Sequence, residues 1–171
     1  MKVFLVLGLF LIHFNALGED AFIDNIEFAG SGCKQENAIA VLSPDQRVLS
    51  LLFDNFIVEA GGEQSRRNKK NCNIKIMIAA PEGKRIVIDK IHYRGYAFVP
   101  SKARMNFKSS YHFEIPSLGM SSRSFLDVIT RVGDVDEDLF VEQQIKGRVL
   151  NRACGEDVLL NIKTNLTVMT S

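Results

Sequence analysis

Apolar and polar residues alternate along most of the chain, and short groups of Gly, Pro, Asn and Asp interrupt the alternation at close intervals. This period of two predicts β-strands, because successive side chains of a strand point to opposite faces of the sheet. Nine strands are expected: residues 22–28, 38–42, 48–58, 73–79, 85–93, 105–115, 125–130, 140–144 and 158–169. The pattern favours an all-β fold, a single domain in which two antiparallel sheets form a sandwich.

Turn-forming residues predict how some strands connect. Ser43–Gln46 and Pro81–Gly83 each separate two apolar strands, so each predicts a hairpin. The segment from Gly61 to Asn71 is polar, starts with two glycines and is rich in basic residues, and it predicts an exposed loop. A short turn near Ser121–Leu126 is the only helical segment expected.

The first residues have a different pattern. A lysine at position 2 precedes the apolar run Val3–Ile12, and the small residues Ala16 and Gly18 follow it. This order predicts a secretion signal over residues 1–18, which leaves residues 19–171 as one secreted or periplasmic domain. A membrane anchor is the alternative, but the run is shorter than the roughly 20 residues that cross a bilayer. We therefore expect no membrane span after cleavage.

Charge is balanced over the chain but uneven along it. There are 21 basic and 20 acidic residues, yet the stretch from Gln64 to Lys108 has 12 basic residues against two acidic ones. Charge separated in this way can orient an anionic partner. It is equally typical of neighbouring strands whose lysines are simply solvated.

The residues that could carry chemistry form no complete motif. Asp134–Asp138 begins like a calcium loop, but Leu139 and Ile145 stand where an EF-hand needs glycine and glutamate, so a solvated acidic loop is expected and a looser calcium site is the alternative. His92 lies three residues after Asp89, which places the two on opposite faces of a strand and argues against a catalytic triad.

Other classes of site lack their signatures. Zinc pairs of the Cys-x-x-Cys type and a Gly-x-Ser-x-Gly elbow do not occur. The sequence therefore predicts no catalytic residue, metal ligand or cofactor, and we expect no nucleic-acid partner for an exported, nearly neutral protein.

Six phrases occur in a fixed order along the chain. They are Gly30–Cys33, Leu42–Asp45, Phe53–Phe56, Arg66–Asn68 with Asn71–Ile74, Tyr93–Ala97, and Cys154–Gly155 followed by Leu160–Leu166. In these phrases the chain resembles a family of small secreted proteins of bacteria and fungi, known as domain of unknown function 4360. The resemblance spans about Ile26 to Val168. It implies export and one compact domain, and it implies no particular activity.

Three cysteines, Cys33, Cys72 and Cys154, are candidates for one disulfide in an oxidising compartment. If the strands that begin at Ala38, Val48 and Asn73 form a meander, Cys33 and Cys72 meet at one end of it. This arrangement favours Cys33–Cys72, and Cys72–Cys154 is the alternative.

The phrase around Tyr93 suggests a local role for its arginine. Gly95 predicts a bulge or a close backbone approach. Arg94 is expected to stack on aromatic neighbours or to pair with a carboxylate such as Asp54, and a ligand-binding role for this face is the second interpretation.

Three functional hypotheses follow. The first is a non-enzymatic binding or structural module of the cell envelope or extracellular space, whose partner is an anionic surface or protein. Its candidate contact residues are Arg66, Arg67, Lys69, Lys70, Tyr93, Arg94 and Tyr96. The second is a secreted hydrolase or an inhibitor of one, which requires a histidine beside a nucleophile. The third is a carrier of apolar ligands, which requires an interior cavity of roughly 300 Å³ or more.

Overall fold

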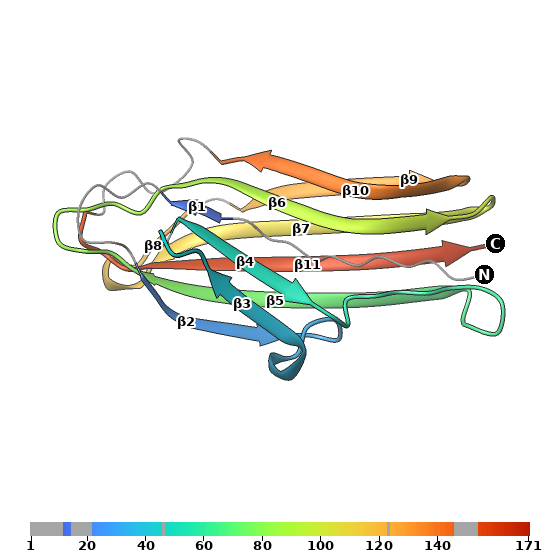
Figure 1. The fold of residues 1–171 in the computed structure, drawn as a ribbon, viewed down its shortest axis with the longest axis horizontal. Coiled ribbons are helices and arrows are strands. Elements are labelled where there is room, and N and C mark those ends of the chain that lie inside the picture. The colour runs from blue at the N-terminus through green and yellow to red at the C-terminus, as the bar shows by residue number, and fades with distance from the viewer. Residues whose placement is uncertain (1–11, 15–21, 46, 123, 146–153) are drawn as a thin grey trace.

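The computed structural model describes residues 12–14, 22–45, 47–122, 124–145 and 154–171. These residues form β-strands that run largely along the long axis of the molecule (Figure 1). The strands are β1 (Ile12–Phe14), β2 (Phe22–Ala29), β3 (Ala38–Leu42), β4 (Val48–Phe53), β5 (Arg67–Ala79), β6 (Ile88–Val99), β7 (Ala103–Ile115), β8 (Met120–Ser121), β9 (Phe125–Val132), β10 (Val135–Gln144) and β11 (Val158–Thr170). Two short 3₁₀ turns cover Gln35–Asn37 and Pro116–Leu118.

The strands make two antiparallel sheets. The five-stranded sheet has the order β10-β6-β1-β4-β3. The six-stranded sheet has the order β2-β5-β11-β7, and both β8 and β9 pair with the outer edge of β7. The all-β, two-sheet fold expected from the alternation is confirmed.

The alternating apolar residues form the core because each sheet turns one face inward. Every second residue of β7 is buried, from Ala103 to Ile115, and β11 buries its apolar positions in the same way. Inside the sandwich, the Tyr93 hydroxyl of the five-stranded sheet lies 2.6 Å from the Ser109 hydroxyl of the six-stranded sheet. Since both residues are at most 3% exposed, this hydrogen bond links the two layers within the core.

Several expected boundaries are wrong for identifiable reasons. Pro81–Gly83 forms a turn, with the Lys84 N–H donating to the Pro81 carbonyl, but the chain crosses there from one sheet to the other and no hairpin forms. The basic segment before Asn71 is not all loop, because β5 already begins at Arg67 and pairs with β11 up to Met169. Ladder hydrogen bonds to a long partner override the polar composition there.

Three further expectations are corrected. The acidic stretch after Asp134 is not a loop, since β10 starts at Val135 and pairs with β6 along its whole length. Gly95 lies in that same ladder opposite Leu139 without a shift of register, so it marks no bulge. The turn expected near Ser121 is replaced by strands β8 and β9, and Arg123 between them lies outside the described residues.

One strand comes from the predicted leader. β1 lies between β4 and β6 and pairs antiparallel with both, with Ile12 opposite Leu49 on one side and Ile91 on the other. The remainder of residues 1–18 lies outside the described residues, and their removal on export stays a prediction. No helix in the described part of the chain is long and apolar enough to cross a membrane.

Candidate functional site

The outer face of the six-stranded sheet carries a field of basic and amide side chains. It arises because most of the positions of β5, β11 and β7 that alternate with the core positions are polar. The exceptions are the apolar residues Met77, Ala79, Leu159 and Met169 near the strand ends, and Glu114 is the one acidic residue among these positions. We call the following residues the basic face: Arg67, Lys69, Asn71, Asn73 and Lys75 of β5, Asn161, Lys163, Asn165 and Thr167 of β11, and Arg104, Asn106, Lys108, Ser110 and His112 of β7.

Three lysines of the basic face form a diagonal line across neighbouring strands. Lys75 is opposite Asn161 and Lys108 is opposite Asn165, while Lys163 lies between these two partners on β11. Diagonal neighbours of this kind are about 7–8 Å apart. The strand register therefore sets three positive charges at regular intervals across the outer face of the sheet.

The charges on this face are poorly balanced by carboxylates. Among the described residues, Lys75 is the only lysine or arginine of the basic face with an ion-pair partner, Glu27 of β2, and that pair is long at 3.9 Å. Its two side chains are about 60% exposed, so the pair contributes little. Lys69, Lys108 and Lys163 are exposed to solvent. The face thus keeps an excess of positive charge that an anionic ligand can neutralise.

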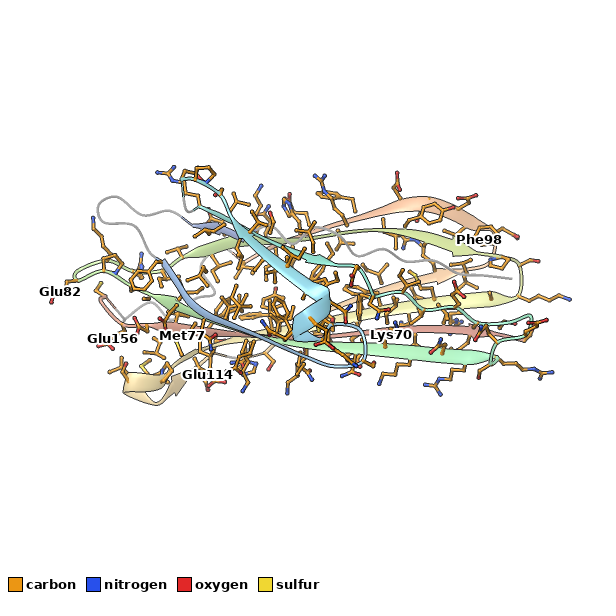
Figure 2. All side chains as sticks on the ribbon, turned by 60° about the horizontal axis from the view of Figure 1, so that its bottom comes forward. Lys70, Met77, Glu82, Phe98, Glu114 and Glu156 are labelled. Carbon is orange, nitrogen blue, oxygen red and sulfur yellow. A yellow bond between two sulfur atoms is a disulfide. The ribbon has the colours of Figure 1, made fainter. Side chains whose placement is uncertain are left out.

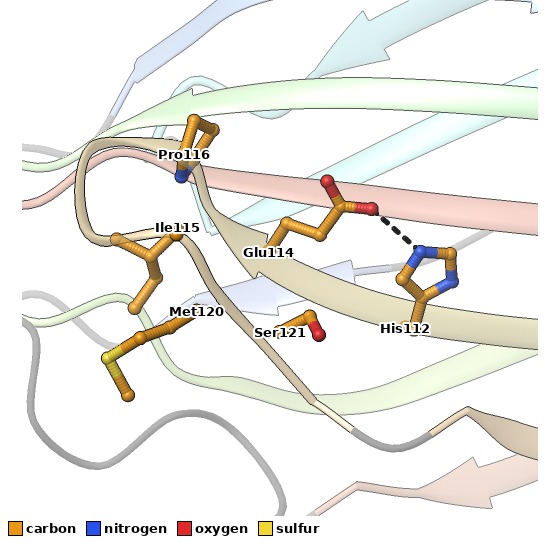
Figure 3. A pocket seen from close by; sticks show the side chains of 7 residues that line it. His112, Glu114, Ile115, Pro116, Met120 and Ser121 are labelled. Atoms are coloured by element: carbon orange, nitrogen blue, oxygen red, sulfur yellow. Dashed lines mark hydrogen bonds and ion pairs between the residues drawn. The ribbon is translucent and has the colours of Figure 1, made fainter.

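The basic face ends at a surface depression of about 430 Å³ (Figure 3). His112 Nε2 lies 2.8 Å from Glu114 Oε1, and the Asn161 amide donates to the same oxygen at 2.9 Å. Ser121 and Met120 line the other side. Glu114 thus has polar contacts with both His112 and Asn161. It is the one carboxylate among the described residues that line the depression.

Two of the basic residues expected from sequence lie on the basic face. Arg67 and Lys69 belong to it, and Arg66 is exposed immediately before β5. Lys70 does not belong, because its side chain is on the opposite side of β5. Its Nζ donates to the Asn55 carbonyl at 2.6 Å and to the Asn55 side-chain oxygen at 3.1 Å. In Figure 2 Lys70 is labelled in the middle of the molecule, away from Met77 and Glu114 near one end.

Three of the phrases that carry the family resemblance meet around a disulfide. They are Gly30–Cys33, Phe53–Phe56 and Asn71–Ile74. Cys33 is bonded to Cys72, and Cys154 is an exposed free thiol. The pairing does not arise from a meander, since β3 and β5 belong to different sheets. It arises because residues 30–33 run beside β5, where the Gly32 N–H donates to the Asn71 carbonyl at 2.9 Å.

Both glycines of this phrase are required by close packing. Gly30 has φ +145°, and a Cβ there would lie 2.3 Å from the Asn71 carbonyl oxygen. A Cβ on Gly32 would lie 2.0 Å from the Phe56 ring. These phrases therefore have a structural role, the locking of the chain before β3 onto β5.

The aromatic and arginine candidates lie on the other sheet and do not join the basic face. Tyr93 is 3% exposed and bonded to Ser109 inside the core, so it is excluded from any contact surface. Arg94 points outward, with its guanidinium carbon 5.2 Å from the centre of the Phe140 ring. It stacks as the sequence suggested, on a partner that the sequence did not identify. Tyr96 also points outward and donates to Asp136.

Electrostatics differ on this outer face of β6 and β10. Carboxylates on this face contact basic side chains across the strands: Glu142 lies 3.7 Å from Lys90 Nζ and 2.8 Å from His92 Nε2. A hydrogen bond from Gln144 lowers the pKa of Glu142, and Lys90 and His92 act in the same direction. The hydrogen bond to Asp136 raises the pKa of Tyr96. Charge on this face is internally compensated, in contrast to the basic face.

The geometry gives little support to the other two hypotheses. Within the described residues the ring of His112 bonds Glu114, and no hydrogen bond joins it to the Ser121 hydroxyl across the depression. No group of three or more His, Cys, Asp and Glu side chains in this part of the chain is arranged to hold a metal. The depressions lined by described residues open on the surface, so none of them is the interior cavity of a carrier.

Comparison with known families matches residues 19–171 to the model described as Domain of unknown function (DUF4360). The chain belongs to this family. The DUF4360 match runs from before β2 to the end of β11 and leaves out β1, which lies before residue 19.

A fungal relative is also similar. It is an uncharacterized secreted protein of Arthroderma benhamiae, 27% identical over 146 residues, which are 84% of this chain and 58% of the relative. The chain therefore spans somewhat more than half the length of that protein. No solved structure matches the chain.

The candidate contact residues named from sequence include none of the three lysines on the diagonal. Lys75 lies five residues after the last basic candidate, Lys70, and Lys108 and Lys163 lie far from it in the sequence. The available signal was alternation itself: in β7 and β11 the basic and amide residues occupy the positions between apolar ones. That signal identifies an exposed face but not which strands share it.

Proposed function

We propose that this protein is a secreted, non-enzymatic binding module that holds an anionic polymer on the basic face of its six-stranded sheet. The observation that carries the proposal is the diagonal of Lys75, Lys163 and Lys108, whose charges are almost without carboxylate partners among the described residues. Export, with removal of residues 1–18, is part of the proposal and is supported by the secreted relative.

The spread of the lysines over three strands and the amides between them suit a polymer better than a small ligand. The diagonal lysines are separated by Asn and Ser side chains such as Asn73, Asn165 and Ser110. Lysines neutralise charge as mobile point cations, and amides both donate and accept hydrogen bonds. An extended chain with repeated anionic and polar groups can use both kinds of contact at once.

Dextran sulfate is a suitable probe, with uncharged dextran as the control ligand. Near an anionic surface each lysine contributes about 1 kcal/mol, so the triple variant Lys75→Gln, Lys108→Gln and Lys163→Gln should bind about 100-fold more weakly at low salt. Wild-type affinity should fall as ionic strength rises, and the variant should show a shallower dependence.

A matched control removes the same charge elsewhere. Lys34, Lys84 and Lys90 lie outside the basic face, and their replacement by glutamine should leave affinity within about threefold of wild type. Equal losses in the two triple variants would show that net charge alone governs binding. Retention of full affinity by the basic-face variant would reject the proposal.

A further inference from the structure

A second depression, of about 420 Å³, lies on the outer face of β6 and β10 and is lined by Arg94, Asp138 and Phe140. Its floor is the backbone of Gly95 and Leu139, because these two residues lie opposite each other in the ladder and the Leu139 side chain belongs to the core. The Phe140 side chain is 55% exposed. The depression therefore presents an accessible aromatic ring to solvent.

The two charged side chains of this depression do not pair with each other. Arg94 is opposite Phe140 and Asp138 is opposite Tyr96, so Arg94 and Asp138 are diagonal neighbours on adjacent strands. In the part of the chain that the structure describes, no hydrogen bond or ion pair joins either side chain to another residue. The guanidinium donors and the carboxylate acceptors are thus available to a ligand in the same depression.

This combination of groups is complementary to a neutral sugar. One cation and one carboxylate give the depression no net charge, so it does not favour the polyanions that suit the basic face. A hydroxyl group can donate to the carboxylate and accept from the guanidinium. A pyranose carries hydroxyls around its edge and C–H groups on its faces, and such a face can pack against an aromatic ring.

We infer that this depression is a binding site for a neutral polysaccharide, one unit of which stacks on the exposed side of the Phe140 ring while its hydroxyls bond Arg94 and Asp138. β-1,4-linked glucose is the class that fits, since the ring substituents of each unit are equatorial and leave C–H groups on both faces. The inference is independent of the proposed polyanion binding, which concerns the other sheet.

Two more aromatic side chains extend the site along β6. Tyr96 and Phe98 alternate with buried residues and therefore share the outer face with Arg94 and Phe140. Alternate residues of a strand are about 6–7 Å apart. The row continues toward the end of the molecule at which Figure 2 labels Phe98. Successive units of a sugar chain can contact this row, so affinity should grow with the length of the oligomer.

The test is an NMR titration with cellohexaose, a soluble oligomer of β-1,4-linked glucose, of isotope-labelled protein secreted by a host expressing the full chain. Amide shifts should concentrate on β6 and β10 around Arg94 and Phe140, with a dissociation constant of about 0.1–5 mM. Cellobiose should bind at least about fivefold more weakly. Because the ligand is uncharged, addition of about 0.5 M NaCl should change the dissociation constant by less than about twofold.

Three results of this titration would overturn the inference. They are the absence of shifts on β6 and β10 at about 10 mM cellohexaose, shifts that concentrate on another face, and binding that is lost at high salt.

Variants of the two residues test the stacking and the hydrogen bonds separately. Phe140→Ala should raise the dissociation constant at least about tenfold, because it removes the stacking surface. Phe140→Tyr keeps the ring and should stay within about threefold of wild type, whereas Phe140→Leu is apolar without a planar ring and should behave like Phe140→Ala. Asp138→Asn should weaken binding about three- to tenfold, since a charged acceptor is lost.

Phe22→Ala is the matched control for Phe140→Ala. Phe22 of β2 is 54% exposed and belongs to the six-stranded sheet, so its replacement should leave the dissociation constant within about twofold of wild type. These positions are all exposed, so the variants should fold, which far-UV circular dichroism and thermal unfolding will verify. Equal losses in Phe22→Ala and Phe140→Ala, or full affinity in Phe140→Ala, would overturn the assignment to this depression.

The two faces can be tested independently. The triple lysine variant of the basic face should bind cellohexaose as wild type does, and Phe140→Ala should keep wild-type affinity for dextran sulfate. Loss of cellohexaose binding in the triple lysine variant would overturn the sugar site on β6 and β10, whatever the outcome with dextran sulfate.

Discussion

Removal of the Cys33–Cys72 disulfide should strongly destabilise the protein. The two cysteines are 39 residues apart in the sequence and at most 2% exposed. In the chain-entropy model a loop of this size contributes about 4 kcal/mol at 25 °C, because the cross-link restricts the unfolded chain. The double variant Cys33→Ala with Cys72→Ala should lose about this much free energy of unfolding.

The assay is urea and thermal unfolding followed by circular dichroism. For a domain of this length 1 kcal/mol corresponds to about 2–4 °C, so the midpoint should fall by about 8–16 °C. Reduced wild-type protein separates the cross-link from the packing of the two side chains, and it should match the double variant within about 1 kcal/mol.

Cys154→Ala is the matched control because Cys154 is an exposed free thiol. It should unfold within about 0.5 kcal/mol of wild type. A loss below about 1 kcal/mol in the double variant would refute the reasoning from loop closure. A large loss in the Cys154 variant would show that Cys72 pairs with Cys154 instead.

Three further predictions concern the core, the turns and the leader. Burial raises the pKa of Tyr93 above its usual value of 10, so above about pH 10 the unfolded protein loses this proton while the folded protein keeps it. The free energy of unfolding should therefore fall as pH rises above about 10. In urea titrations at alkaline pH, Tyr93→Phe should show a smaller fall than wild type. Gly30→Ala should cost at least about 3 kcal/mol, whereas Gly83→Ala, at positive φ but in open space, should cost about 1 kcal/mol in the same unfolding assay. Removal of residues 1–18 takes β1 away, so amides of β4 and β6 should exchange faster with deuterium than in the full chain, and unchanged exchange would contradict the pairing.

Local pattern was sufficient for much of the fold. In β7 every second residue from Ala103 to Ile115 is buried, as period-two alternation predicts. The turn that contains Pro44 and Asp45 joins β3 to β4 as a hairpin, because these residue types favour a bend. Both features depend on residues close in sequence.

Long-range pairing could not be predicted from the same pattern. Pro81–Gly83 has the composition of a hairpin turn, but the strands on its two sides do not pair with each other. β5 pairs with β2 and β11, and β6 belongs to the other sheet. The basic face depends on that choice, since Lys75, Lys163 and Lys108 become neighbours only when β11 lies between β5 and β7. Likewise, Tyr93 lies in a phrase with Arg94 and Tyr96, and only the packing of the sheets shows that it is buried.

The most direct test of the proposed binding face is an NMR titration of isotope-labelled protein with short dextran sulfate chains. Amide shifts should concentrate on β5, β11 and β7, with the largest changes near Lys75, Lys163 and Lys108, and should vanish at high salt. Shifts that concentrate on β6 and β10, or that are absent at low salt, would contradict the assignment of function to this face.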